Sequence, residues 1–175
     1  MSISESTFDT GPYQVNICNQ TSQKAVNQNL LRQGICLVLQ DYKIERAVIG
    51  LGIITDDAIQ KMNKQFLDHD YATDVLSFPL SENVRHVLEG EIAISYDTAQ
   101  QRAGEFGWNM ENELLLYAVH GTLHLVGLSD QTPEDQHRMR LAEKDILSQM
   151  KITLPDENTD KVNHCHTDAS DESDL

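Results

Sequence analysis

The stretch ENELLLYAVHGTLHLV, residues 111–126, decides how this chain folds. It is apolar on most sides of a helix, and a helix that is apolar all round lies in the middle of a domain. Asn109 can cap its first turn, and Gly127 ends it. The sequence therefore predicts a central buried helix around which the other elements pack.

Two histidines stand one turn apart on this helix. His120 and His124 are spaced i and i+4, so both imidazoles lie on one helix face and can reach one ion. Gly127 lets the chain fold back, and Asp130 is then the nearest side chain that can complete a set of three ligands. Two imidazoles and a carboxylate suit zinc, with a fourth position left for water. The alternative interpretation is a pair of hydrogen-bonded core histidines beside an ordinary turn aspartate.

A glycine follows the first of these histidines. The zincin protease motif HExxH would place a glutamate there as the general base, but this chain has Gly121. A zincin-type protease is therefore disfavoured, and we expect the glycine to leave room for the backbone of a substrate to approach.

A second polar cluster is NKQFLDHDYATDVLSFP, residues 63–79. It lies between a predicted helix and a predicted strand that Pro79 marks as an edge strand, because proline cannot donate to the ladder. Two interpretations stay open for it. It is either a turn built from Asp and His side chains, or one wall of a cleft that faces the two histidines and holds an extended ligand.

The flanking segments alternate between strands and helices. Strands are predicted near residues 15–17, 47–54, 74–78 and 91–96, and further helices over residues 23–42, 55–67, 97–105 and 132–150. Thr55 and Thr132-Pro133 provide helix starts. This order predicts an α+β fold with a mixed sheet of about four strands packed with helices, and with the histidines on the central buried helix.

The two ends of the chain are more polar than its middle. Residues 1–13, with a Gly11-Pro12 break, are predicted to be a flexible arm, and residues 14–154 a single metal-binding domain. Residues 155–175 are rich in acids and have no periodicity, so a disordered tail is expected. The histidine pair His164 and His166 falls in this tail and is interpreted as solvated.

Composition limits the classes of function. The 175 residues hold 13 Lys and Arg against 28 Asp and Glu, a net charge of -15, which argues against a broad basic face for nucleic acid. No apolar run approaches the ~20 residues of a membrane span, and the N-terminus has no secretory pattern. The three cysteines lie far apart without a CxxC motif, so a reducing cytoplasm is expected.

Together these residues resemble the YbeY family of metal-dependent endoribonucleases, over about residues 14–150. The family pattern HGxLHLxGYDH is matched from His120 through Gly127. Its earlier pattern, LNxxYRxxDxxTDVLSFP, is matched by Met62-Asn63, Asp70 and residues 73–79, and Gly90-Glu91-Ile92 is similar to its GDI. Two positions depart from the family. Its third histidine falls on Asp130, and the arginine of its YR pair falls on Leu67, which cannot bind a phosphate.

The resemblance implies a zinc-dependent endoribonuclease, with one Zn²⁺ ion, that prefers single-stranded RNA and acts in rRNA maturation and ribosome quality control. Its expected metal ligands are His120, His124 and Asp130, and its expected proton-transfer groups are His69 and Glu91. Expected substrate contacts are Lys64, Thr73, Asp74, Ser77 and Arg85. His69, Lys64, Arg85 or Arg102 would supply the positive charge lost at Leu67. Expected partners are ribosomal RNA, the small ribosomal subunit and ribosomal proteins, with no membrane and no DNA.

Two other functions stay open. One is a metal-dependent hydrolase of a peptide or amide, which Gly121 weakens. The other is a ribosome-associated metal-binding protein without nuclease activity, which Leu67 and the acidic composition favour. RNA cleavage that depends on metal would separate the proposed nuclease from both.

Overall fold

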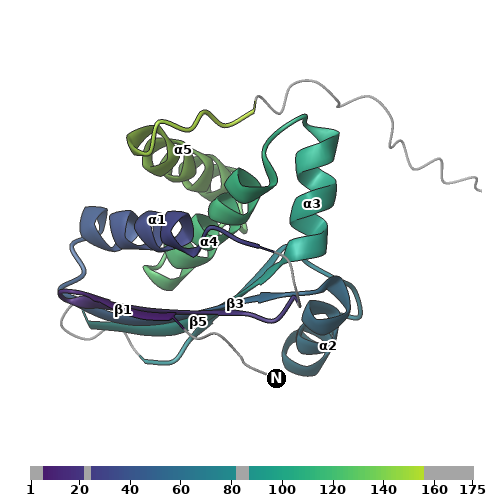
Figure 1. The fold of residues 1–175 in the computed structure, drawn as a ribbon, viewed down its shortest axis with the longest axis horizontal. Helices are drawn as coiled ribbons and strands as arrows, with labels where there is room; N and C mark the ends of the chain where they lie inside the picture. Colours follow the sequence, from purple (N-terminus) through teal and green to yellow (C-terminus); the bar gives the residue numbers. More distant parts are fainter. Residues whose placement is uncertain (1–5, 22–24, 82–86, 156–175) are drawn as a thin grey trace, which may run out of the picture.

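The computed structural model describes residues 6–21, 25–81 and 87–155 of the chain. A mixed sheet of five strands has the order β1-β2-β3-β5-β4 (Figure 1). Three parallel strands form its centre, β2 (Tyr13–Asn19), β3 (Arg46–Ile54) and β5 (Val87–Ser95). At the two edges β1 (Ser6–Thr10) and β4 (Val75–Pro79) run antiparallel to their neighbours. The predicted α+β class, the mixed sheet and the edge position of Pro79 are confirmed.

The strand that the sequence analysis did not predict is β1. It lies in the segment predicted to be a flexible arm, and that prediction is wrong for residues 6–13. β1 pairs with β2 from Ser6 opposite Ile17 to Thr10 opposite Tyr13. The Gly11-Pro12 break is the turn between the two strands, and Gly11 has a φ of 70°, which a glycine adopts without strain. The residues of β1, STFDT, lack an apolar run, so the sequence pattern did not indicate a strand there.

The helices lie on both faces of the sheet (Figure 1). One face is covered by α1 (Gln28–Asp41) and α4 (Met110–Leu125), with α5 (Pro133–Gln149) packed outside them. The helix α2 (Asp56–Leu67) lies on the opposite face, and α3 (Tyr96–Glu105) stands beside α4 at one end of the sheet.

The predicted helix starts have the expected caps. The side chains of Thr55, Asn109 and Thr132 each accept a hydrogen bond from a backbone N–H in the first turn of α2, α4 and α5. Such a bond satisfies one of the amide groups that a helix start otherwise leaves without a partner.

The central helix α4 is buried as predicted. Leu114, Leu115, Val119 and Leu123 are fully buried. It lies against β5 and β4, where Ile92 and Val75 approach Gly121. The Ser77 hydroxyl donates a hydrogen bond to the Gly121 carbonyl over 3.1 Å. The close approach at Gly121 is therefore made by the sheet, and the prediction that this glycine leaves room for a substrate is wrong.

Replacing Gly121 with alanine should destabilise the fold. The new Cβ would lie 2.7 Å from Cγ2 of Ile92 and 3.0 Å from Oγ of Ser77, so α4 and the sheet would have to separate. We expect a loss of about 1–3 kcal/mol in the free energy of unfolding, measured by urea denaturation, although alanine favours a helix by ~1 kcal/mol over glycine. Gly104→Ala in α3 is the control, because nothing lies within 4 Å of its Cβ. An equal gain in both variants would contradict this packing.

Residues 156–175 lie outside the described residues, so the predicted acidic tail, with His164 and His166, stays a prediction. In the part of the chain that the structure describes, every helix is too short or too polar to cross a bilayer.

Candidate metal centre

Three side chains meet at the end of α4. Nε2 of His120 lies 2.9 Å from Nε2 of His124, and Oδ2 of Asp130 lies 3.7 Å and 3.5 Å from these two atoms. Two ligands of one tetrahedral zinc ion are about 3.4 Å apart, given bond lengths near 2.1 Å. The three atoms therefore lie close enough together to share one ion, as the sequence predicted. Among the described residues, these three side chains form the group that could hold a metal ion.

The hydrogen bonds on the far side of each imidazole decide which nitrogen carries a proton. Nδ1 of His124 lies 2.9 Å from the carbonyl oxygen of Leu128, which can only accept, so Nδ1 donates. Nδ1 of His120 lies 2.7 Å from a carboxylate oxygen of Glu143 and donates to it in the same way. In the neutral rings both Nε2 atoms then present lone pairs to each other, an arrangement that a cation between them would relieve. The site thus fits a metal ion.

Glu143 comes from α5 and was missed in the sequence. Its side chain is buried, and its second oxygen accepts a hydrogen bond from Nη1 of Arg140 over 3.2 Å. The sequence contains one indication of its role. Glu143 lies between Met139 and Ile146 in the apolar stripe of α5, where a carboxylate without a partner would be costly.

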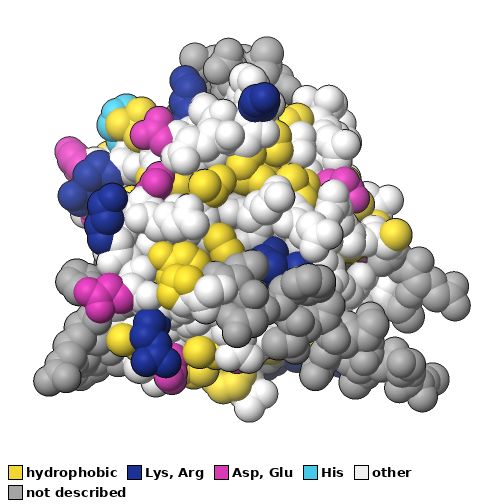
Figure 2. Space-filling model, turned by 60° about the vertical axis from the view of Figure 1, so that its left-hand side comes forward, with side chains coloured by type: hydrophobic (Ala, Val, Ile, Leu, Met, Phe, Trp, Pro, Cys, Tyr) yellow, Lys and Arg dark blue, Asp and Glu magenta, His cyan; other side chains and the backbone are white. Residues whose placement is uncertain are grey.

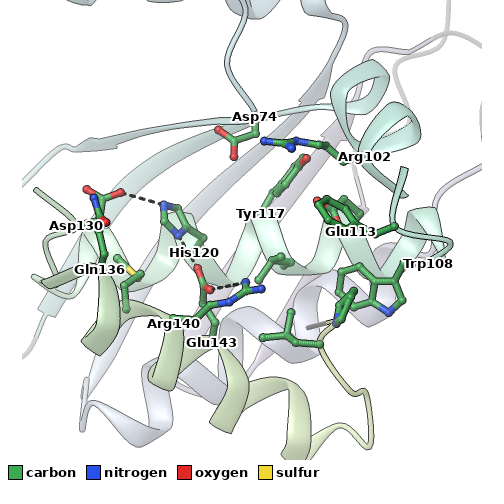
Figure 3. Close-up of a pocket in the computed structure, with 15 residues that line it drawn as sticks. Asp74, Arg102, Trp108, Glu113, Tyr117, His120, Asp130, Gln136, Arg140 and Glu143 are labelled. Carbon is green, nitrogen blue, oxygen red and sulfur yellow. Dashed lines mark hydrogen bonds and ion pairs between the residues drawn. The ribbon is translucent and has the colours of Figure 1, made fainter. Parts of the chain in front are cut away.

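The metal centre opens into a cleft of about 620 Å³. Four carboxylates line it, from Asp74, Glu113, Asp130 and Glu143, and two arginines, Arg102 and Arg140. Figure 3 shows Asp130 and His120 at one end and Trp108 at the other, with Arg102 above Tyr117 between them. Because carboxylates outnumber arginines, the charge of the cleft favours a bound cation.

The surroundings of His120 raise its pKa. Burial by itself favours the neutral ring and lowers the pKa, but the hydrogen bond with Glu143 and the charges of Glu143, Asp74 and Asp130 outweigh it. A proton and a metal ion therefore compete for this imidazole.

Glu113 and Tyr117 lie one turn apart on α4, in the same cleft. Burial is the main cause that raises the pKa of the Glu113 carboxyl, and a hydrogen bond with Tyr117 opposes this in part. Burial and the neighbouring Glu113 also raise the pKa of the Tyr117 phenol. Glu113 can therefore hold a proton at a pH at which an exposed glutamate has lost it.

Glu113→Gln should make stability less dependent on pH. Between the ordinary pKa and the raised pKa of Glu113 the native state binds more protons than the unfolded state, so stability falls as pH rises through this window. Glutamine does not titrate. The melting temperature of the variant should therefore exceed that of the wild type near neutral pH, and the difference should shrink towards about pH 4. A difference that does not change with pH would contradict the buried, proton-holding Glu113.

The structure brings part of the predicted substrate wall to the cleft. Asp74 lines it, and its Oδ1 accepts hydrogen bonds from the Thr73 hydroxyl and from the Val75 amide. Thr73 thus orients Asp74. Of the cations considered as replacements for an arginine at Leu67, Arg102 is the one among the described residues that lines the cleft.

Other predicted site residues lie elsewhere. Lys64 is on α2, the helix on the opposite face, and pairs with Asp70 at 2.6 Å. His69 is exposed in the following loop and stacks on Tyr71. Neither lines the cleft, and Arg85 falls outside the described residues.

Glu91 and Ser77, which were predicted to act on the substrate, do not line the cleft either. Side chains alternate along a strand, so Glu91 lies on the face opposite its neighbour Ile92, which packs on Gly121. The carboxylate of Glu91 lies over Gly50 of β3 instead. Ser77 bonds the backbone of α4 and so joins the sheet to the central helix, a role in the fold.

The fold and this site define a small α+β protein whose central helix carries two histidines that, with Asp130 beyond the helix end, form a candidate metal centre. A family model described as endoribonuclease YbeY matches residues 16–151. The chain belongs to the YbeY endoribonuclease family.

Relatives of the same description support this. The one from Rhodopirellula baltica is 41% identical over 136 residues, which cover 74% of this chain and 70% of the relative. The one from Chlorobium chlorochromatii is 35% identical over 151 residues, 85% of this chain and 95% of the relative. The solution structure of TM1509 from Thermotoga maritima matches with a TM-score of 0.54 at 25% identity, over 78% of this chain and 91% of that chain.

Proposed function

We propose that this protein is a zinc-dependent endoribonuclease that prefers single-stranded RNA. The observation that carries the proposal is the pair of Nε2 atoms that face each other beside the Asp130 carboxylate, in a cleft that also holds two arginines. Membership of the YbeY family and the relatives described as endoribonucleases support RNA as the substrate.

His120, His124 and Asp130 would hold the ion, and a bound zinc ion supplies a Lewis acid that polarises a phosphoryl oxygen and activates water. The residues of the chain have separate tasks around it. Glu143 fixes the ring of His120 through its hydrogen bond to Nδ1. Arg102 offers its guanidinium to a phosphate of the RNA, and Glu113 lines the same cleft with a carboxyl whose pKa is raised by burial.

The acidic surface favours local contact with RNA and docking on a basic partner. On the face in Figure 2, Lys and Arg side chains lie in small separate groups with acidic side chains near some of them. A protein with few cations releases few counterions from RNA, so free RNA should bind weakly. Basic ribosomal proteins would suit this surface. We therefore propose action on ribosomal RNA at the small subunit in the cytoplasm, in rRNA maturation and ribosome quality control.

The open site disfavours a purely structural metal. Structural zinc ions are held by four protein ligands, whereas the described residues offer three, and the side chain of Asp130 is 44% exposed to the cleft. A peptide hydrolase of the zincin type would need a carboxylate at position 121, where the structure has the contact of Gly121 with the sheet.

The test is cleavage of a ribosomal RNA fragment with single-stranded and duplex segments. Zinc-loaded protein should cut the single-stranded segments, a chelator should stop cleavage, and added zinc should restore it. A peptide substrate should stay intact. Binding of zinc without any cleavage, on free RNA or on small subunits, would favour the alternative of a metal-binding ribosomal partner.

A further inference from the structure

The cleft is polar at one end and apolar at the other. Asp130 and His120 lie at the polar end, and Trp108 lies at the other end (Figure 3). The other apolar side chains that line the cleft are Phe106, Leu116, Met139, Leu154 and Pro155. Arg102 and Arg140 lie between the two ends (Figure 3). A cleft of this size that combines apolar walls with a few placed polar groups is typical of a small-ligand site.

The two aromatic residues are placed by the way α3 ends. Phe106 caps the helix, and Gly107 follows with a φ of 60°, which turns the chain. The Trp108 amide then donates to the carbonyl of Ala103 over 2.8 Å. Trp108 packs partly on the hydrophobic core, whereas Phe106 is 42% exposed. The aromatic end is thus fixed by the backbone, with ring surface left towards the cleft.

We propose that Phe106 and Trp108 form a base-stacking subsite that holds one nucleobase of the RNA while the adjacent phosphate faces Arg102 and Arg140. This rests on the proposed function. Every base has a flat π face, so aromatic side chains bind single-stranded RNA without a preference for sequence. An arginine beside the aromatic residues adds the charge that the phosphate needs.

The position of the arginines favours a nucleotide over a purely apolar ligand. The side chain of Arg102 is 54% exposed, and its Nη1 lies 3.7 Å from a carboxylate oxygen of Glu105, which is a loose ion pair. Two other exposed aromatic residues, Phe66 and Tyr71, do not line this cleft and pack on Phe78 and His69 instead. They provide matched controls.

The single tryptophan of the chain makes the test direct, because Trp108 is the one indole and it lies in the subsite. Adenosine 5′-monophosphate has no internal phosphodiester bond, so zinc-loaded protein cannot cleave it as an RNA chain. AMP should quench the fluorescence of Trp108, which is excited at the red edge of its absorption. The quenching should saturate as the AMP concentration rises. Ribose 5-phosphate, which has the same phosphate without the base, should bind on the order of ten-fold more weakly and leave the fluorescence unchanged.

Variants then locate the base. Trp108→Ala should raise KM for a short single-stranded RNA on the order of ten-fold with a small change in kcat, because stacking holds substrate and transition state alike. Trp108→Phe keeps an aromatic ring and should keep most of the affinity for RNA. This result would show that the effect of Trp108→Ala comes from the loss of stacking and not from misfolding. Tyr71→Ala should bind AMP as the wild type does. Equal quenching by ribose 5-phosphate, or a Trp108→Ala variant with unchanged KM, would overturn the proposal.

The failure of this subsite can be told from the failure of the nuclease. If zinc-loaded protein cleaves RNA while AMP leaves Trp108 fluorescence unchanged, the aromatic end has another occupant and the nuclease proposal stands. If AMP binds and quenches but RNA is never cleaved, the subsite stands and the proposed reaction does not.

Discussion

The His124→Ala variant is expected to lose zinc almost completely. The ion would keep two of three protein ligands, and Nε2 of His120 would lose the partner 2.9 Å away. Loss of a group that merely supports a ligand costs 10–100-fold in metal affinity, so loss of a ligand should cost more than about 100-fold. Metal analysis after dialysis and calorimetric titration with zinc measure the loss. RNA cleavage should disappear with it.

Two controls make this result specific. His137→Ala removes an exposed histidine of α5 and should keep its zinc. The melting temperature of the wild type should rise with zinc, because an ion that binds only the native state stabilises it, and this rise should vanish in His124→Ala. Full zinc content in the double variant His120→Ala, His124→Ala would refute the metal centre.

Asp130→His should bind zinc more tightly than the wild type. The carboxylate oxygen of Asp130 is 3.5 Å and 3.7 Å from the two imidazole nitrogens, so a third imidazole at this position completes the set that the family pattern has. Asp130→Ala should weaken binding. Weaker binding by the histidine variant than by alanine would show that position 130 does not face the ion.

The sequence was sufficient to predict that the three candidate ligands meet, because their geometry is local. The i, i+4 spacing of His120 and His124 fixes their common face once the helix is known, and the apolar setting predicts the helix. Asp130 follows within six residues, beyond the turn at Gly127. The family resemblance pointed to the same positions.

The partners of these ligands could not be predicted because they depend on how distant elements pack. Glu143 reaches His120 only because α5 crosses α4. Arg102 was one of four candidate cations, and it lines the cleft because α3 stands beside α4. The face of Glu91 could have been predicted, since Ile92 and Ile94 alternate with it and a strand of this kind turns its apolar side to the core. The family motif drew attention to its position and not to its face.

Glu143 offers the sharpest test of how the cleft supports its ligands. Its buried carboxylate accepts from Nδ1 of His120 at 2.7 Å and from Arg140 at 3.2 Å, so it orients the ring and balances a guanidinium at once. In Glu143→Ala both donors lose their acceptor, and the ring can turn. Zinc affinity should fall 10–100-fold.

Glu143→Gln separates orientation from charge. The glutamine oxygen can still accept from Nδ1 of His120, whereas the negative charge beside Arg140 is gone. We expect a smaller loss of affinity, below about ten-fold, and Glu134→Gln, in the exposed first turn of the same helix, should have no effect. If the alanine and glutamine variants lose zinc equally, the charge of Glu143 matters and its hold on the ring does not. If neither loses zinc while both melt at the wild-type temperature, the imidazole of His120 is held in place by α4 alone.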